Sequence, residues 1–433
     1  MGHSSPILSR ASAAIILSSV ALAERPGITV LPFPARDARA VSERVEFSHD
    51  SELLELLRFE SSVVLVGVPW SSGIDLDLER CPDPAEPGAF HVDGRPAGDG
   101  GMQTASFWRG RVRGEQDSDV FLGFAGGVWG WIQRADELVH VLSLPADAGD
   151  GQISVLIDER ALNARGSRFK GLCMTAAPRG GQVVNPAALG TAASSAGSAR
   201  PPRMLFGTLA IETDWQFFQL FGDLNAARGY VMSLLAAANS RFRVQVGVHL
   251  TASYLGFYTT PADPWLAQDA GGNCFDVLYE FQDAWRDGAA PVPSDLHHLL
   301  SGVDLGCGVA FLDALCDPAE SFSLTSRMDG LTPFPVAAST LNWDFVWMCH
   351  ELGHNFGTGH THEYCPPLDE CSPSGYFGPC QDEMACTNQG TMMSYCHACP
   401  GGMSNFTTWF HPVVQQTMRS ASEASCLRSF QTR

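Results

Sequence analysis

The sequence has little charge, and positive charge is especially scarce. Only 17% of the 433 residues are charged, and 27 lysines and arginines stand against 47 aspartates and glutamates. The formal net charge is therefore -20, and the pI is near 4.9. A surface this acidic repels phosphate backbones and anionic lipid. We therefore expect neither nucleic acid nor a membrane surface as a partner.

Long apolar runs are also lacking. Apart from a short run near the amino end, no stretch approaches the roughly 18 apolar residues that indicate a membrane-spanning helix. That short run, residues 11–23, follows Arg10 and ends in the small-x-small pattern of a signal-peptidase site. We interpret residues 1–23 as a secretory signal, with a short buried helix as the alternative. The mature protein is predicted to be secreted and to have no membrane anchor.

Cysteine is scarce in the first half and dense in the second. Only Cys81 and Cys173 precede Cys274, and eleven of the thirteen cysteines lie between Cys274 and Cys426. In an exported chain this density predicts disulfides, although the sequence does not give their pairing. An odd total leaves at least one thiol without an intramolecular partner. The expected disulfide partners near the motif described below are Cys349, Cys365, Cys371, Cys380, Cys386, Cys396, Cys399 and Cys426. A structural zinc at Cys396-x-x-Cys399 is the weaker alternative.

Composition and patterning predict two folded domains. Hydrophobic residues make up 45% of the chain, and 43 glycines and 27 prolines indicate many turns. Residues 24–184 contain short alternating segments typical of β-strands. Residues 185–202 are rich in small residues and proline and have no periodicity, as in a linker. Residues 203–433 alternate strand and helix patterns, which predicts a mixed α/β domain with a twisted sheet covered by helices.

Individual elements of the second domain can be placed by periodicity. Two segments have apolar residues at helical spacing, residues 223–242 and 275–288. Five segments are predicted to be strands: residues 203–215, 243–252, 295–302, 306–315 and, at an edge of the sheet, 321–327.

The strongest signal is "HELGHNFGTGHTH" at residues 350–362, which holds four of the thirteen histidines. Asn342 is a suitable N-cap and Gly357 a suitable stop for a helix over this region. On such a helix His350 and His354 lie one turn apart on one face, close enough for both to bind one metal ion. Gly357 permits a sharp turn that brings His360 back as a third ligand.

Three histidines leave one coordination position open, which is typical of a catalytic rather than a structural zinc. A water molecule bound there would attack a peptide carbonyl, with Glu351 as the general base that passes the proton to the leaving amine. The alternative is a set of core histidines, which would need three separate buried hydrogen-bond acceptors.

The long motif H-E-x-x-H-x-x-G-x-x-H resembles that of the metzincin peptidases. "GTMMSYC" at residues 390–396 resembles their methionine-containing turn, with Met393 as the turn methionine. Residues 203–427 are similar to the reprolysin (adamalysin) family, in particular its secreted bacterial members. The resemblance implies a metzincin-like catalytic domain in a zinc endopeptidase that is secreted as a zymogen. It also implies a calcium ion bound by Glu212 and residues near the carboxyl end.

The sequence departs from that family at two positions. Thr361 follows the third histidine, where reprolysins commonly have aspartate, so any role of that aspartate is absent or taken elsewhere. Tyr395 stands two positions after Met393, as in astacin-like members, in which it ligates zinc or stabilises the oxyanion. A catalytic Tyr395 is one hypothesis, and a buried structural tyrosine is the alternative.

If the protein is secreted as a zymogen, residues 24–184 are expected to be its propeptide, mostly β in structure. Its thiol would block the zinc, with Cys173 preferred over Cys81; a disulfide between the two is the alternative. Cleavage would fall in or near "SARPPRML" in the linker. We expect a monomer acting on proteins or peptides. Two other functions stay open: a catalytically silent binding protein on a metzincin scaffold, and a zinc hydrolase of a non-peptide bond.

Overall fold

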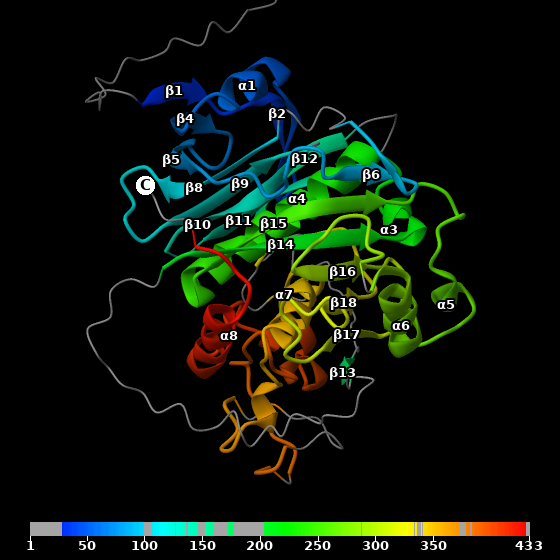
Figure 1. Ribbon diagram of the computed structural model, residues 1–433. Coiled ribbons are helices and arrows are strands. Elements are labelled where there is room, and N and C mark those ends of the chain that lie inside the picture. Colours follow the sequence, from blue (N-terminus) through cyan, green and yellow to red (C-terminus); the bar gives the residue numbers. More distant parts are fainter. Residues whose placement is uncertain are drawn as a thin grey trace, which may run out of the picture.

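The computed structural model describes residues 28–98, 105–145, 152–158, 161, 172–176 and 203–429, with gaps at 126, 136, 287, 333, 336–338, 340, 370, 372–377 and 382. The predicted signal, residues 1–23, and the predicted linker, residues 185–202, lie outside them. The described chain folds into two β-sheets, one above the other, with most helices around the lower one (Figure 1). A mostly β first half and an α/β second half are therefore both present.

The upper sheet comes from the first half of the chain, and residues 28–158 are called the N-terminal domain below. Its strand order is β1-β4-β5-β8-β9-β10-β11-β12-β3-β2. The bounds are β1 Thr29–Pro32, β2 Ala35–Val41, β3 Arg44–His49, β4 Ser62–Val68, β5 Ile74–Arg80, β8 Ser106–Val112, β9 Asp119–Phe124, β10 Val128–Gln133, β11 Leu138–Pro145 and β12 Gln152–Asp158; helix α1 is Ser51–Leu57. Neighbouring strands run antiparallel except β1 and β4, and three neighbouring pairs, β1–β4, β5–β8 and β12–β3, are not consecutive in the sequence.

The lower sheet has the order β13-β17-β18-β16-β14-β15-β6-β7. The bounds are β6 Phe90–Val92, β7 Arg95–Pro96, β13 Leu172–Ala176, β14 Leu205–Thr213, β15 Val248–Phe257, β16 Leu296–Leu300, β17 Cys307–Phe311 and β18 Phe322–Thr325. Three neighbouring pairs are parallel: β15 with β14, β14 with β16, and β16 with β18. Strand β17 is antiparallel to β18. Both ends of the sheet, β13 and the β6–β7 hairpin, come from the first half of the chain.

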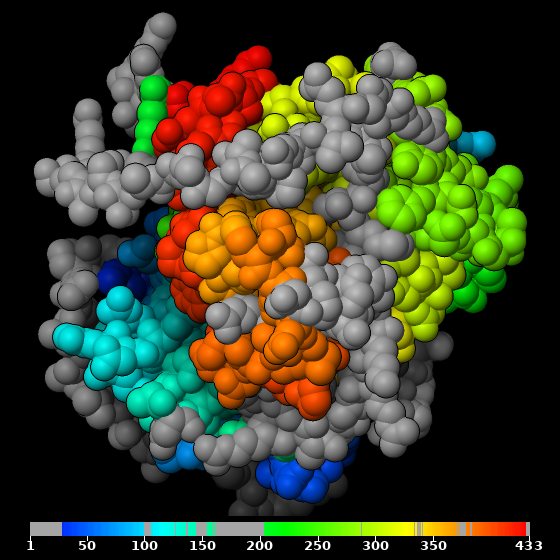
Figure 2. All heavy atoms as spheres, turned by 90° about the horizontal axis from the view of Figure 1, so that it is seen from below, coloured from blue at the N-terminus to red at the C-terminus, as the bar shows by residue number. Residues whose placement is uncertain are grey.

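The helices lie mostly in the second half. The α-helices are α3 Trp215–Gln219, α4 Leu224–Arg241, α5 Leu266–Asp269, α6 Cys274–Trp285, α7 Trp343–Asn355 and α8 Pro412–Ala424. Helix η3, Phe242–Val246, is a π turn, and η4 Thr361–Glu363, η5 Cys396–Ala398 and η6 Gly402–Asn405 are 3-10 turns. None of the helices described here combines the length and apolar character needed to cross a bilayer. Seen from below, the segment that follows α7 (orange) occupies the middle of the surface (Figure 2).

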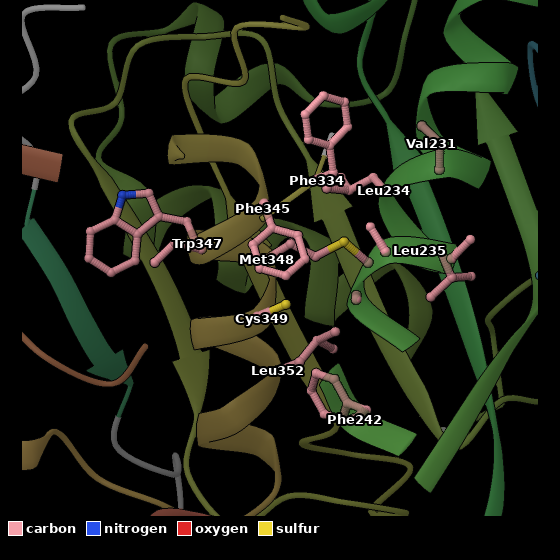
Figure 3. Packing of buried hydrophobic residues seen from close by; sticks show 14 of the residues in the cluster. Val231, Leu234, Leu235, Phe242, Phe334, Phe345, Trp347, Met348, Cys349 and Leu352 are labelled. Carbon is pink, nitrogen blue, oxygen red and sulfur yellow. The ribbon is translucent and has the colours of Figure 1, made fainter. Parts of the chain in front are cut away.

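Alternation along the lower sheet separates two cores. Leu209 and Ile211 of β14 point to the side covered by α4 and α7, whereas Ala210 between them joins the cluster under α6. Between α4 and α7 the side chains of Leu235 and Met348 interdigitate with their neighbours (Figure 3). Each such fully buried side chain contributes roughly 1.5–3 kcal/mol. Helix α7 is therefore fixed by packing along its length.

Two predicted strands differ from the structure. The segment at 321–327 is predicted to lie at an edge, but β18 lies between β16 and β17, and all four of its residues are buried. Its polar residues are satisfied inside, because Ser323 and Thr325 hydrogen-bond to the two ring nitrogens of His298 at 2.7 and 3.1 Å. The strand expected from residue 243 begins only at Val248, because η3 extends α4 and ends at Gly247 with φ 72°.

Among the cysteines whose side chains the structure describes there are five disulfides: Cys274–Cys307, Cys316–Cys426, Cys365–Cys380, Cys371–Cys396 and Cys386–Cys399. The prediction that Cys349 is a disulfide partner is wrong: it is a free thiol buried between α7 and α4 (Figure 3). A zinc site at Cys396 and Cys399 is also wrong, because each is joined to another cysteine. Cys81 is free too, which contradicts the alternative of a Cys81–Cys173 disulfide.

Candidate active site

The candidate site is built on α7. As predicted, the helix begins directly after Asn342 and ends at Asn355, just before the glycine turn at Gly357. His350 and His354 lie one turn apart, with ring centroids 4.8 Å apart, and both are fully buried. The i, i+4 spacing therefore places the two imidazoles on one helical face.

The chain turns back after α7. Gly357 has φ 84°, a conformation that favours glycine, and a Cβ there would lie 2.9 Å from the Oδ1 atom of Asp313. His360 follows in extended backbone, and its ring centroid lies 5.3 Å from that of His350 and 4.6 Å from that of His354. The nearest ligand atoms of the three histidines all lie within 4.8 Å of one another. The structure thus brings the three predicted ligands together.

The outer ring nitrogens fix how each imidazole is oriented. Nδ1 of His350 lies 2.5 Å from the carbonyl oxygen of Met392, and Nδ1 of His354 lies 2.8 Å from that of Thr358. A carbonyl oxygen only accepts, so both Nδ1 atoms carry the proton and both Nε2 atoms keep a lone pair. Nδ1 of His360 faces the carboxylate of Glu363 at 3.3 Å. This is the outer-shell pattern typical of metal-binding histidines.

The inner nitrogens fit a zinc ion. Nε2 of His350 and Nε2 of His360 are buried and have no hydrogen-bond partner among the described residues. Such atoms are costly to bury unless something binds them. Burial, with the neighbouring His360 as a smaller cause, lowers the pKa of His354 to about 3. Its imidazole is therefore neutral at pH 7, as a metal ligand must be. Three neutral nitrogens at this spacing suit zinc with one position left open.

Glu351 lies beside this cluster, against strand β17. Its carboxyl group is fully buried. A Cβ placed on Gly308 of β17 would meet the Oε1 atom of Glu351 at 2.2 Å and its Cδ atom at 2.8 Å. Only a residue without a side chain leaves room there for the carboxylate. Strand β17 therefore fixes where Glu351 lies relative to the histidines.

Two acidic residues that sequence reasoning missed hold the third histidine. Glu363 accepts a hydrogen bond from the backbone amide of His360 at 2.7 Å, in addition to facing its ring. The Thr361 hydroxyl donates to Asp369, whose other oxygen accepts from the amide and the hydroxyl of Thr391, each at 3.1 Å. Asp369 thereby joins the turn of His360 to the segment that carries Met393. Both residues therefore contact the turn that carries His360 and Thr361.

The remaining predicted site residues lie close by. The Sδ atom of Met393 would be 2.6 Å from a Cβ on Gly353, so this methionine packs directly against α7 between the two helical histidines. Tyr395 is buried, and its ring centroid lies 4.4 Å from that of His360. The side chain of Cys173 lies outside the described side chains; its backbone, in β13, pairs with Gly308.

The expected calcium site finds no support at Glu212. Burial raises the pKa of this carboxyl to about 8, so it is mostly neutral at pH 7. It accepts hydrogen bonds from the Tyr254 hydroxyl at 3.1 Å and from the Thr213 amide at 3.3 Å. Among the described residues it belongs to no cluster with the spacing of metal ligands.

Comparison with known families bears on this geometry. Residues 207–410 match the family model Reprolysin_5, described as metallo-peptidase family M12. The matched range contains α7, His360 and the segment of Met393. The match supports a reprolysin-like metzincin in this part of the chain and, with it, a metallopeptidase of a family that typically uses zinc. The N-terminal domain lies outside the matched residues.

One solved structure similar to this chain is described as "Structure of a chaperone-substrate complex". The two chains are 14% identical with a TM-score of 0.31, and the match covers 51% of this chain and 35% of that one. The match thus spans about a third of the other chain, and a likeness this distant carries no argument about function.

The Glu363→Gln variant tests how His360 is held. Loss of the negative charge beside Nδ1 is expected to lower the affinity for zinc by about 10- to 100-fold, as is typical for outer-shell partners of metal-binding histidines. Competition with a chromophoric chelator measures this directly, without an activity assay. Glu423→Gln on α8, a half-exposed partner of Arg419, is the matched control. Equal zinc affinity in both variants would mean that Glu363 does not position His360.

Proposed function

We propose that this protein is a secreted zinc endopeptidase made as a zymogen. His350, His354 and His360 are the proposed zinc ligands, and Glu351 is the proposed general base. One observation carries the proposal: three buried imidazoles converge, with their outer nitrogens hydrogen-bonded or facing a carboxylate, next to a buried glutamate. The five disulfides are consistent with an exported protein.

Zinc in this position would supply a Lewis acid that activates water and polarises a peptide carbonyl. Glu351 takes the proton of the attacking water and delivers it to the leaving amine nitrogen. Met393 supports the helical histidines from the side of Gly353. Tyr395 stands beside His360, where its hydroxyl is proposed to assist the oxyanion; packing against the ring is its alternative role.

The zymogen part of the proposal rests on β13. This strand follows the N-terminal domain in the chain but pairs in parallel with β17, the strand that positions Glu351. The register sets Cys173 opposite Gly308. An extended substrate would need the same edge of β17 to pair with the enzyme. We therefore propose that β13 blocks the site until the chain is cut in the linker, with Cys173 as the thiol that would bind the zinc.

The proposal is tested on the full chain after a single cut within residues 185–202. We expect one zinc ion per chain by elemental analysis, and hydrolysis of casein or fluorogenic peptides that a chelator removes and added zinc restores. A cut chain that binds zinc but cleaves nothing in a broad peptide library would overturn the endopeptidase. The outcome would then favour a silent binding scaffold or a hydrolase of another bond.

A further inference from the structure

Helix α4 is buried on all sides, which is unusual for a helix that covers one face of a sheet. Fifteen consecutive residues, from Ala226 to Ser240, are buried. The one charged residue among them, Arg228, is 2% exposed and places its guanidinium 4.9 Å from the ring centre of Phe90 in β6. A helix with one face on a sheet and the other in water normally carries charge on the outer face. The sequence of α4 is therefore suited to a second permanent neighbour.

That neighbour is the N-terminal domain. Trp129 of β10 packs edge-to-face on Tyr230 of α4, with ring centroids 5.5 Å apart. Strand β9 approaches so closely that a Cβ on Gly123 would lie 3.2 Å from the Oγ atom of Ser233. Residues of both halves belong to one continuous apolar cluster; from the N-terminal sheet it includes Phe107, Phe121, Trp129, Trp131, Leu138 and Leu142. The two domains thus share a core.

The same domain also holds the segment that leads into the active-site helix. Phe334, nine residues before α7, lies between two rings of the N-terminal sheet. Its ring is stacked on His140 of β11, with centroids 5.4 Å apart and an interplanar angle of 9°, and its centroid lies 5.9 Å from that of Trp131. His140 and Phe334 are both fully buried. Loss of the N-terminal sheet would leave this segment without its packing partners.

A third contact covers the edge of the peptidase sheet. Strand β6 pairs in parallel with β15, and the backbone amide of Leu255 donates to the carbonyl oxygen of Ala89 at 2.8 Å. The side chain of Asp93 accepts from the amide of Thr259 at 2.8 Å. Without this hairpin β15 would expose the unpaired groups of an edge strand, which is a site of aggregation.

We infer that the N-terminal domain is a permanent, non-covalent subunit of the active enzyme, and that cleavage in the linker releases only β13 from its position. Only the cleavage step of this inference rests on the proposed function. Aromatic burial on this scale is typical of obligate interfaces rather than of transient ones. Strand β13, by contrast, is described only by its backbone, which pairs with five residues of β17 at the end of the peptidase sheet. The N-terminal domain thus supports the structure, and β13, which follows it in the chain, inhibits the site.

The test is a full chain with a specific protease site inserted within residues 185–202, cut to completion and passed over a size-exclusion column in high salt. We expect the two pieces to elute together as a 1:1 complex of the intact mass, and to stay together on dilution. Trp129→Ala should raise the dissociation constant of the cut pieces by about 30-fold or more, as for a central aromatic contact. Phe59→Ala, at a position 76% exposed on the same domain, is the matched control and should leave it unchanged.

The outcomes separate this inference from the proposed function. If the peptidase half elutes alone and folded, with an unchanged near-ultraviolet circular dichroism spectrum, the N-terminal domain is a removable propeptide and the inference is overturned. If the pieces co-elute but no peptide is cleaved, the subunit is supported and the endopeptidase fails. Equal dissociation constants for Trp129→Ala and Phe59→Ala would also contradict a shared core. Should Trp129→Ala not fold, Phe90→Leu provides a milder change at the contact with Arg228.

Discussion

The Glu351→Gln variant of the cut chain is expected to lose peptide hydrolysis while it keeps its zinc. Glutamine has nearly the same shape as glutamate, so it fits the space against Gly308, but its amide does not accept the proton of the attacking water. Removal of a general base lowers kcat by about 100- to 10,000-fold. The measurement is kcat for a fluorogenic peptide, beside the zinc content of the same sample.

The pair of readouts makes the result specific. Loss of activity with full zinc content assigns the proton transfer to Glu351, because the three histidines are unchanged. Loss of zinc along with activity would instead mean that the carboxylate holds the metal site together. Glu52→Gln, in the exposed first turn of α1, is the control for the substitution itself. A variant that cleaves at the wild-type rate would exclude Glu351 as the base.

The histidine cluster could be predicted because it depends on local geometry. Two histidines four residues apart on a helix must share a face, and Gly357 permits the turn that returns His360. The helix itself is predicted from Asn342 as N-cap and Gly357 as stop, and its observed bounds, Trp343–Asn355, agree. None of these inferences needs contacts between distant parts of the chain.

Glu363 and Asp369 could not be placed in the same way. Each acts through a loop conformation that follows from the packing of α7 against the segment of Met393, and loop conformation has no periodicity to detect. One signal is present in the sequence, a glutamate three residues after His360, which is the spacing of a capping pair in a short turn. For Asp369 the sequence offers only Thr361, which stands where aspartate is common. This shows that the usual aspartate is missing, but it does not identify the residue that contacts the turn instead.

Three elements, β18, η3 and α4, depend on contacts that their own sequences do not identify. Strand β18 has two polar residues, which is typical of an edge, but they are satisfied by the buried ring of His298. The alternating valines expected to form a strand from residue 243 begin inside η3, where Val244 is exposed and Val246 is buried, so alternation alone does not distinguish the end of a helix from the start of a strand. In α4 the informative feature is an absence: a long helix with almost no charge indicates a covered outer face. That feature predicts burial without naming the partner.

The Gly308→Ala variant should inactivate the enzyme without a change to any proposed ligand or to the base. The added Cβ would lie 2.2 Å from the Oε1 atom of Glu351, and the buried carboxylate has no solvent into which it can move. It must therefore shift relative to the histidines or push β17 outward. A displacement of about 1 Å in a catalytic group costs about 100-fold in rate. Overpacking should also cost about 1–3 kcal/mol of stability.

Measurement of kcat/KM, zinc content and the melting temperature on the cut chain separates these effects. We expect a loss of about 100-fold in kcat/KM with zinc retained and only a moderate fall in Tm, because the overpacking is confined to one contact. Gly98→Ala is the matched control, since a Cβ there meets nothing within 4 Å. Normal kcat/KM in Gly308→Ala would mean that the position of Glu351 against β17 is not the reactive one. The close approach of β17 would then serve packing alone, and the case for β13 as the inhibitory strand, which rests on its pairing with β17, would weaken with it.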